Sequence, residues 1–167
     1  MNGKAYRVAL YGLCIALAFI LSYLESLIPI QMMPGMKVGL TNLVVLIALY
    51  YLNAKAAFVI NLVRILLVAF TFGNLQSLCY SAAGGILAYL VMVGLKSTKR
   101  FAIVTVSVAG SIFHNVGQIL VAMVMVETTS ITWYLAVLTI SAIVAGIVVG
   151  TLGGIVLTKL PQDMKKE

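Results

Sequence analysis

The sequence predicts an all-α integral membrane protein that folds as a bundle of six transmembrane helices. Hydrophobic residues make up 63% of the 167-residue chain and charged residues only 9%, whereas soluble domains carry roughly a quarter charged residues. The mean hydropathy is +1.15. Six apolar segments approach the roughly 20 residues that a spanning helix needs. The sequence lacks the alternation of a membrane β-barrel, so we expect these segments to be helical.

The six predicted spans follow one another along a single domain. They cover about residues 7–28, 38–52, 54–72, 75–95, 101–126 and 132–158. The first span follows two basic residues, as a signal peptide would, but it is too long for a signal peptide and lacks a cleavage site of small residues. We therefore expect it to be retained as a membrane helix.

The basic residues predict how the bundle is oriented. Nine of the eleven Lys and Arg residues lie on one side of the predicted spans. These nine are Lys4, Arg7, Lys55, Lys96, Lys99, Arg100, Lys159, Lys165 and Lys166. Because basic loops stay in the cytoplasm, we expect both termini to be cytoplasmic, in a multi-pass protein of a bacterial cell membrane. This distribution explains the net charge of +7 without a nucleic-acid partner.

A charged residue lies near the middle of the third predicted span. Arg64 is nine residues beyond Lys55, about 13 Å into a hydrocarbon core roughly 30 Å thick. Asn61 shares its helix face one turn earlier. A buried guanidinium must find a partner or water, because leaving it unpaired in the membrane costs a few kcal/mol or more. Two interpretations remain open: Arg64 contacts a ligand, or it is a structural strut bonded to neighbouring helices.

Other polar residues gather at the midplane and in the outer half of the predicted bundle. On the fifth span, His114 lies roughly 21 Å above the cytoplasmic boundary. This asymmetry predicts a pocket that opens to the outside and has a closed, apolar floor. Its predicted ligand is a small polar or anionic molecule. The residues expected to bind it are Asn61, Arg64, His114, Asn115 and Gln118, with Lys37 and Asn42 under the first outer loop.

The acidic residues are too few and too scattered to predict catalysis. The chain has four, and no two of them lie within one turn of each other on a span. With a single histidine and no carboxylate pair, we expect no metal site, no cofactor and no catalytic residue. We expect Glu25 to serve the rim of the pocket or Lys37, because its estimated height differs from that of Arg64 by over 10 Å.

Two further patterns have more than one interpretation. Small residues recur every four positions at Ala142, Gly146, Gly150 and Gly154, which favours packing within the bundle over an interface between subunits. The loop at 28–42 contains a Pro-Gly turn and several methionines. It either covers the pocket or simply joins two helices.

Four segments carry a resemblance to a known family. They are PGMKVGLTN (34–42), NLVRILL (61–67), SAAGG (81–85) and HNVGQ (114–118). In this order they resemble the family called heptaprenyl diphosphate synthase component I, also called Gx transporters. That family is similar to the substrate-binding S components of energy-coupling-factor (ECF) importers. The resemblance implies a six-helix S-component-like fold that works with a coupling subunit and ATPases.

The resemblance also implies where a partner subunit docks. S components contact the coupling subunit through small residues of the first helix, and the corresponding residues here are Ala9, Gly12 and Ala16. Other functions remain open: a non-catalytic accessory subunit in polyprenyl or quinone metabolism or flavin-linked electron transfer, or a structural assembly partner. An isoprenoid binder should have an apolar cleft facing the lipid, whereas an importer subunit should have a polar cavity.

Overall fold

The computed structural model describes residues 3–27, 39–126 and 132–161, and within these ranges it contains helices and no strand. The helices are α1 (Gly3–Leu27), α2 (Leu40–Tyr51), α3 (Ala54–Thr71), α4 (Leu75–Ser97), α5 (Ile103–Val126) and α6 (Thr132–Lys159). The all-α class and the order of six helices are therefore confirmed. Five of the helices are long and apolar enough to cross a membrane.

The exception is α2, which has only 12 residues. At 1.5 Å per residue it is about 18 Å long, little more than half of a hydrocarbon core of roughly 30 Å. The helix begins after Gly39, whose φ of 79° lies in the left-handed region that favours glycine. The predicted second span, the shortest of the six, is thus a half-length helix.

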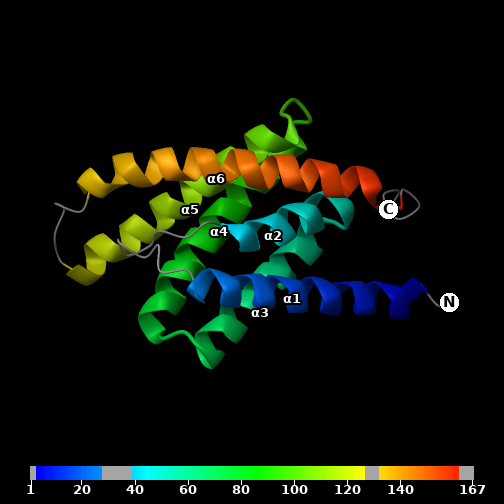
Figure 1. The fold of residues 1–167 in the computed structure, drawn as a ribbon, viewed down its shortest axis with the longest axis horizontal. Helices are drawn as coiled ribbons and strands as arrows, with labels where there is room; N and C mark the ends of the chain where they lie inside the picture. Colours follow the sequence, from blue (N-terminus) through cyan, green and yellow to red (C-terminus); the bar gives the residue numbers. More distant parts are fainter. Residues whose placement is uncertain (1–2, 28–38, 127–131, 162–167) are drawn as a thin grey trace.

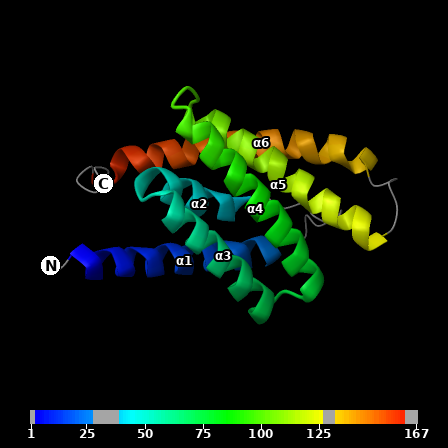
Figure 2. The ribbon, with the colours of Figure 1, turned by 180° about the vertical axis from the view of Figure 1, so that it is seen from behind.

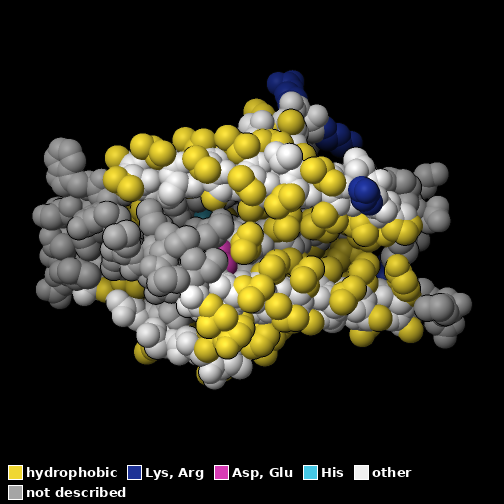
Figure 3. Space-filling view, viewed as in Figure 1, with side chains coloured by type: hydrophobic (Ala, Val, Ile, Leu, Met, Phe, Trp, Pro, Cys, Tyr) yellow, Lys and Arg dark blue, Asp and Glu magenta, His cyan; other side chains and the backbone are white. Residues whose placement is uncertain are grey.

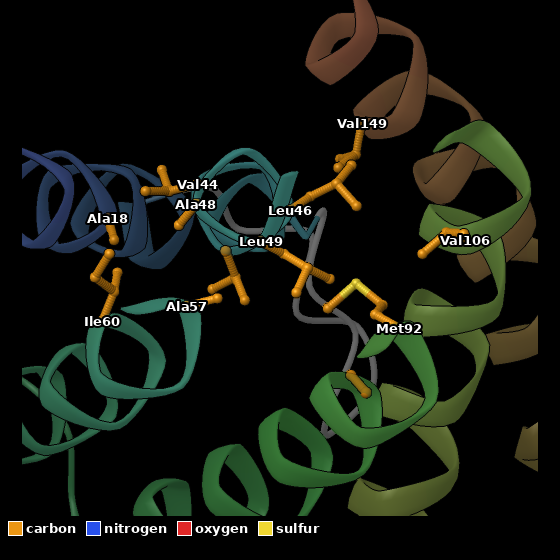
Figure 4. Packing of buried hydrophobic residues seen from close by; sticks show 12 residues of the cluster. Ala18, Val44, Leu46, Ala48, Leu49, Ala57, Ile60, Met92, Val106 and Val149 are labelled. Carbon is orange, nitrogen blue, oxygen red and sulfur yellow. The ribbon is translucent and has the colours of Figure 1, made fainter. Parts of the chain in front are cut away.

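The short helix occupies the centre of the bundle. It packs against each of the other five helices, and its side chains supply much of the core. Val45, Leu46 and Leu49 are almost fully buried. In Figure 4, α2 residues lie next to residues of α1 and α3 on one side and next to residues of α4 and α6 on the other. The half-length helix therefore lies at the centre of the helix packing.

The long helices run across the bundle so that α1 begins and α6 ends at the same end of the molecule (Figures 1 and 2). On the face drawn in Figure 3, hydrophobic side chains predominate, and Lys and Arg side chains appear in the half nearer that end. This arrangement agrees with an even number of crossings and with basic residues on one side of the membrane.

The stripe of small residues on α6 packs inside the bundle. A Cβ atom added at Gly146 would lie 2.6 Å from the Cα atom of Val108, and one added at Gly150 would lie 2.7 Å from that of Val104. Any side chain there would push α6 away from α5. The interpretation of this stripe as internal packing is confirmed at both glycines.

The orientation can be tested on the two exposed ends of α4. In a variant whose native cysteines are replaced by serine, we expect Gln76→Cys to react with a membrane-impermeant maleimide in intact cells, because the start of α4 faces outward. Ser97→Cys, at the basic end, should react only after the cells are lysed. The reverse pattern would invert the predicted topology.

Candidate ligand-binding site

The half-length helix α2 has an opposite charge at each of its ends. At its start, Glu25 of α1 accepts hydrogen bonds from the backbone N–H of Leu40 (2.6 Å) and the hydroxyl of Thr41 (3.4 Å). At its other end, the Lys96 ammonium group donates to the carbonyl oxygen of Leu49. Because the N-terminus of a helix carries partial positive charge and its C-terminus partial negative charge, both contacts stabilise α2.

Arg64 is buried on α3, with only 6% of its surface exposed. Its Nη2 atom donates to Oδ1 of Asn61 (2.8 Å), and Nδ2 of Asn61 donates to the carbonyl oxygen of Gly85 on α4 (3.1 Å). The predicted pairing of Asn61 with Arg64 is therefore present. Among the described residues, the Nε atom of Arg64 has no hydrogen-bond partner, so the guanidinium keeps a donor for a further contact.

The expected separation of over 10 Å in height between Glu25 and Arg64 does not fit the way in which α1 packs against α3. Ala18 of α1 and Ile60 of α3 belong to one core cluster, where Figure 4 shows them next to each other. Glu25 is about 10 Å beyond Ala18, and Arg64 about 6 Å beyond Ile60, which leaves about 4 Å between their levels. The expectation failed because α1 begins beyond the start of α3 (Figure 1).

A small cavity lies between the start of α2 and four other helices. Its volume is about 20 Å³, which is enough for a water molecule. It is lined by Gly39, Thr41, Asn42, Arg64, Ser81, Ser111, His114, Asn115, Ala142 and Ala145. Hydroxyl, amide, imidazole and guanidinium groups therefore converge on one point inside an otherwise apolar bundle.

Four of the predicted pocket residues line this cavity, namely Asn42, Arg64, His114 and Asn115. Asn61 does not line the cavity but accepts a hydrogen bond from Arg64, which does. Gln118 is buried one turn from His114 and is not part of the lining either. Lys37 and the rest of 28–38 lie outside the described residues.

The prediction did not include Thr41, Ser81 or Ser111 among the binding residues, although all three hydroxyls line the cavity. Ser111 precedes His114 by three residues and therefore shares its helix face. That spacing was the signal that sequence analysis missed.

A pair of glycines on α4 brings the two halves of the site together. A Cβ atom at Gly84 would lie 2.7 Å from the carbonyl oxygen of His114, and one at Gly85 would lie 2.9 Å from Cδ1 of Ile65. Gly84 thus lets α5 approach α4, and Gly85 lets α3 approach it from the other side.

The predicted docking stripe on α1 is exposed. Ala9, Gly12 and Ala16 are all on the surface of the bundle, and a Cβ atom at Gly12 would meet nothing within 4 Å. The described part of the chain therefore does not need these small residues for its own packing. The same helix exposes larger apolar side chains such as Leu13 and Ile20, as expected for a surface in contact with lipid.

Comparison with known proteins identifies the family. The family model described as heptaprenyl diphosphate synthase component I matches residues 14–156. The chain belongs to this family. Neither the curated proteins nor the solved structures give a significant match.

The matched range of this component I chain includes a buried amide, that of Gln118. Its bonding helps to distinguish a ligand site from ordinary helix packing. Gln118 is only 3% exposed, and neither Oε1 nor Nε2 has a hydrogen-bond partner among the described residues. Such a group costs about 1–3 kcal/mol. A polar residue that weakens the fold in this way is typical of a functional site.

We therefore expect Gln118→Met to raise the thermal stability of the purified protein, by about 1–3 kcal/mol, because it removes an unpaired amide of similar size. Asn61→Leu is the contrasting variant, and it should lower stability because it leaves Arg64 and the carbonyl of Gly85 without their partner. Thermal unfolding in detergent measures both. A clear loss of stability in Gln118→Met would mean that its amide is already bonded.

Proposed function

We propose that this protein is the substrate-binding membrane subunit of an ECF-type or related importer. It captures a small polar or anionic molecule from the outer side of the membrane. The observation that carries the proposal is the convergence of polar side chains from four helices on a cavity within an apolar bundle. Ligand sites place a small number of polar groups in a mostly apolar surrounding, and polar residues at membrane depth mark substrate pathways.

The core below the cavity supports loading from one side. Between the cavity and the end of the bundle where α1 begins, α2 contributes apolar residues that are nearly all buried, among them Leu46, Ala48 and Leu49 (Figure 4). A continuous pore would need polar lining at both levels. Because the apolar core closes one side of the cavity, the subunit can release its ligand on that side only after a conformational change.

The volume of the cavity sets a condition on this proposal. About 20 Å³ holds one water molecule, so a metabolite enters only if the helices around the cavity move apart. Glu25 joins α1 to the start of α2 through two hydrogen bonds. Their rupture would separate these two helices at the wall of the cavity without disturbing the apolar core.

We further propose that the chain is not itself an enzyme, although its family is named after a synthase. Synthesis of prenyl diphosphates needs Mg²⁺ held by carboxylates against the diphosphate oxygens. Glu25 is the only acidic side chain in the described part of the chain, and its two oxygens already bind the start of α2.

The family name also supports a second candidate function, a non-catalytic accessory subunit in polyprenyl or quinone metabolism or flavin-linked electron transfer. Such a subunit would hold an isoprenoid tail in an apolar cleft. The cavity described here has a polar lining, which is better suited to a small water-soluble molecule. The exposed stripe at Ala9, Gly12 and Ala16 favours the importer because it leaves room for a partner helix.

The ligand proposal predicts that Arg64→Ala loses the small molecule that co-purifies with the gently extracted protein. Arg64→Lys should restore it poorly if the guanidinium makes a bidentate contact. Native mass spectrometry measures the bound mass, and Lys55→Ala, which removes an exposed charge from the same helix, is the control. Retention of the same molecule by Arg64→Ala would reduce the residue to a structural strut.

The importer proposal predicts that Gly12→Trp or Ala16→Trp abolishes uptake and co-purification with a coupling subunit, because a bulky side chain holds the partner helix away. Ligand binding should be unchanged, since the stripe lies away from the cavity. Leu13→Trp, on an exposed and already bulky position of α1, is the matched control. Full cellular function in both variants, with no coupling subunit ever recovered, would favour the accessory subunit.

A further inference from the structure

The only acidic side chain in the described part of the chain lies one hydrogen bond away from the lining of the cavity. Glu25 accepts a hydrogen bond from the hydroxyl of Thr41, and Thr41 and Arg64 line the same cavity. Glu25 is itself buried, with 9% of its surface exposed. A positive side chain therefore lines the cavity, and a negative one is hydrogen-bonded to another lining residue.

Both carboxyl oxygens of Glu25 accept hydrogen bonds. Its Oε1 atom accepts from a backbone N–H at the start of α2, 2.6 Å away, and its Oε2 atom accepts from a hydroxyl. Hydrogen bonds donated to a carboxylate favour its charged form, and so does the positive end of a helix. The attraction between Glu25 and Arg64 acts in the same direction.

The remaining polar groups at the cavity are amides and hydroxyls, with His114 as the other titratable side chain among the described lining residues. With His114 uncharged, the charges of Arg64 and Glu25 cancel. An anionic ligand in contact with the guanidinium would have the Glu25 carboxylate close by, bonded to the Thr41 hydroxyl, so the repulsion from Glu25 would offset part of the attraction of Arg64. An uncharged molecule would meet no such repulsion.

We propose that the site selects a ligand without net charge that carries both hydrogen-bond donors and acceptors, and that Glu25 is the residue that excludes anions. This inference rests on the proposed binding function and narrows its ligand class. The unbonded Nε–H of Arg64 offers a donor to a ligand carbonyl. Amide and hydroxyl groups such as those of Asn42 and Ser81, which line the cavity, serve as donor or acceptor.

Acetamide and acetate provide a test, because they have nearly the same shape and differ in charge. We would measure the apparent affinity of both from thermal shifts of the purified protein, with sodium chloride at equal ionic strength as the control. Three proteins are compared: the unmodified chain, Glu25→Gln, and the double variant Glu25→Gln/Arg64→Gln. The two-carbon probes require the least widening of the cavity.

The unmodified chain should prefer acetamide. Glu25→Gln leaves the charge of Arg64 uncompensated, so the affinity for acetate relative to acetamide should rise about tenfold or more, the size of a one-unit electrostatic effect on a carboxylate. The double variant again has no net charge and should return to a preference for acetamide. If Glu25 only anchored α2, the preference would neither shift toward acetate in Glu25→Gln nor return to acetamide in the double variant.

A preference for acetate in the unmodified chain would overturn the inference and leave the proposed function standing, and this outcome holds even if Glu25→Gln fails to fold. An unchanged preference in a folded Glu25→Gln would also overturn it. If neither probe shifts any of the three proteins, the proposed binding function itself fails, and the inference fails with it.

Discussion

The fold depends on the burial of one guanidinium group halfway through an apolar bundle. Arg64 is nearly inaccessible, and the groups around it are arranged to support its charge. Asn61 binds it from the same helix, and Glu25 compensates it from α1. Removing a charge from water inside a membrane is costly unless partners are in place. The bundle therefore has to bring polar groups from several helices to one depth, and that requirement produces the site.

The half-length helix makes this arrangement possible. A full-length second span would place apolar residues beside Arg64, whereas α2 begins at that depth and presents free backbone N–H groups and a partial positive charge. Glu25 accepts from one of these groups, the N–H of Leu40, and from the hydroxyl of Thr41 beside the cavity. On the opposite side, the glycine pair at Gly84 and Gly85 lets α3 and α5 approach α4 closely enough to enclose the cavity.

Much of this architecture could be predicted from the sequence because hydrophobicity and helix spacing are local properties. The helices, the face shared by Asn61 and Arg64 and the face shared by His114 and Gln118 follow from runs of apolar residues and from intervals of three and four. The start of the short second helix was predicted to within two residues, but its central place in the packing was not, because no local pattern shows which helices it contacts. The partnership of Glu25 with Arg64 also failed, since it depends on how far α1 is displaced along α3, and no local pattern encodes that displacement.

The central claim is that the polar cluster around Arg64 binds a small molecule. An experimental structure of the protein, extracted gently from its native membrane, would test it most directly. The account predicts a wider cavity that holds ligand density in contact with Arg64, Thr41 and His114. A cavity that stays near 20 Å³, with every donor of Arg64 bonded to protein carbonyls, would contradict it and leave Arg64 as a strut.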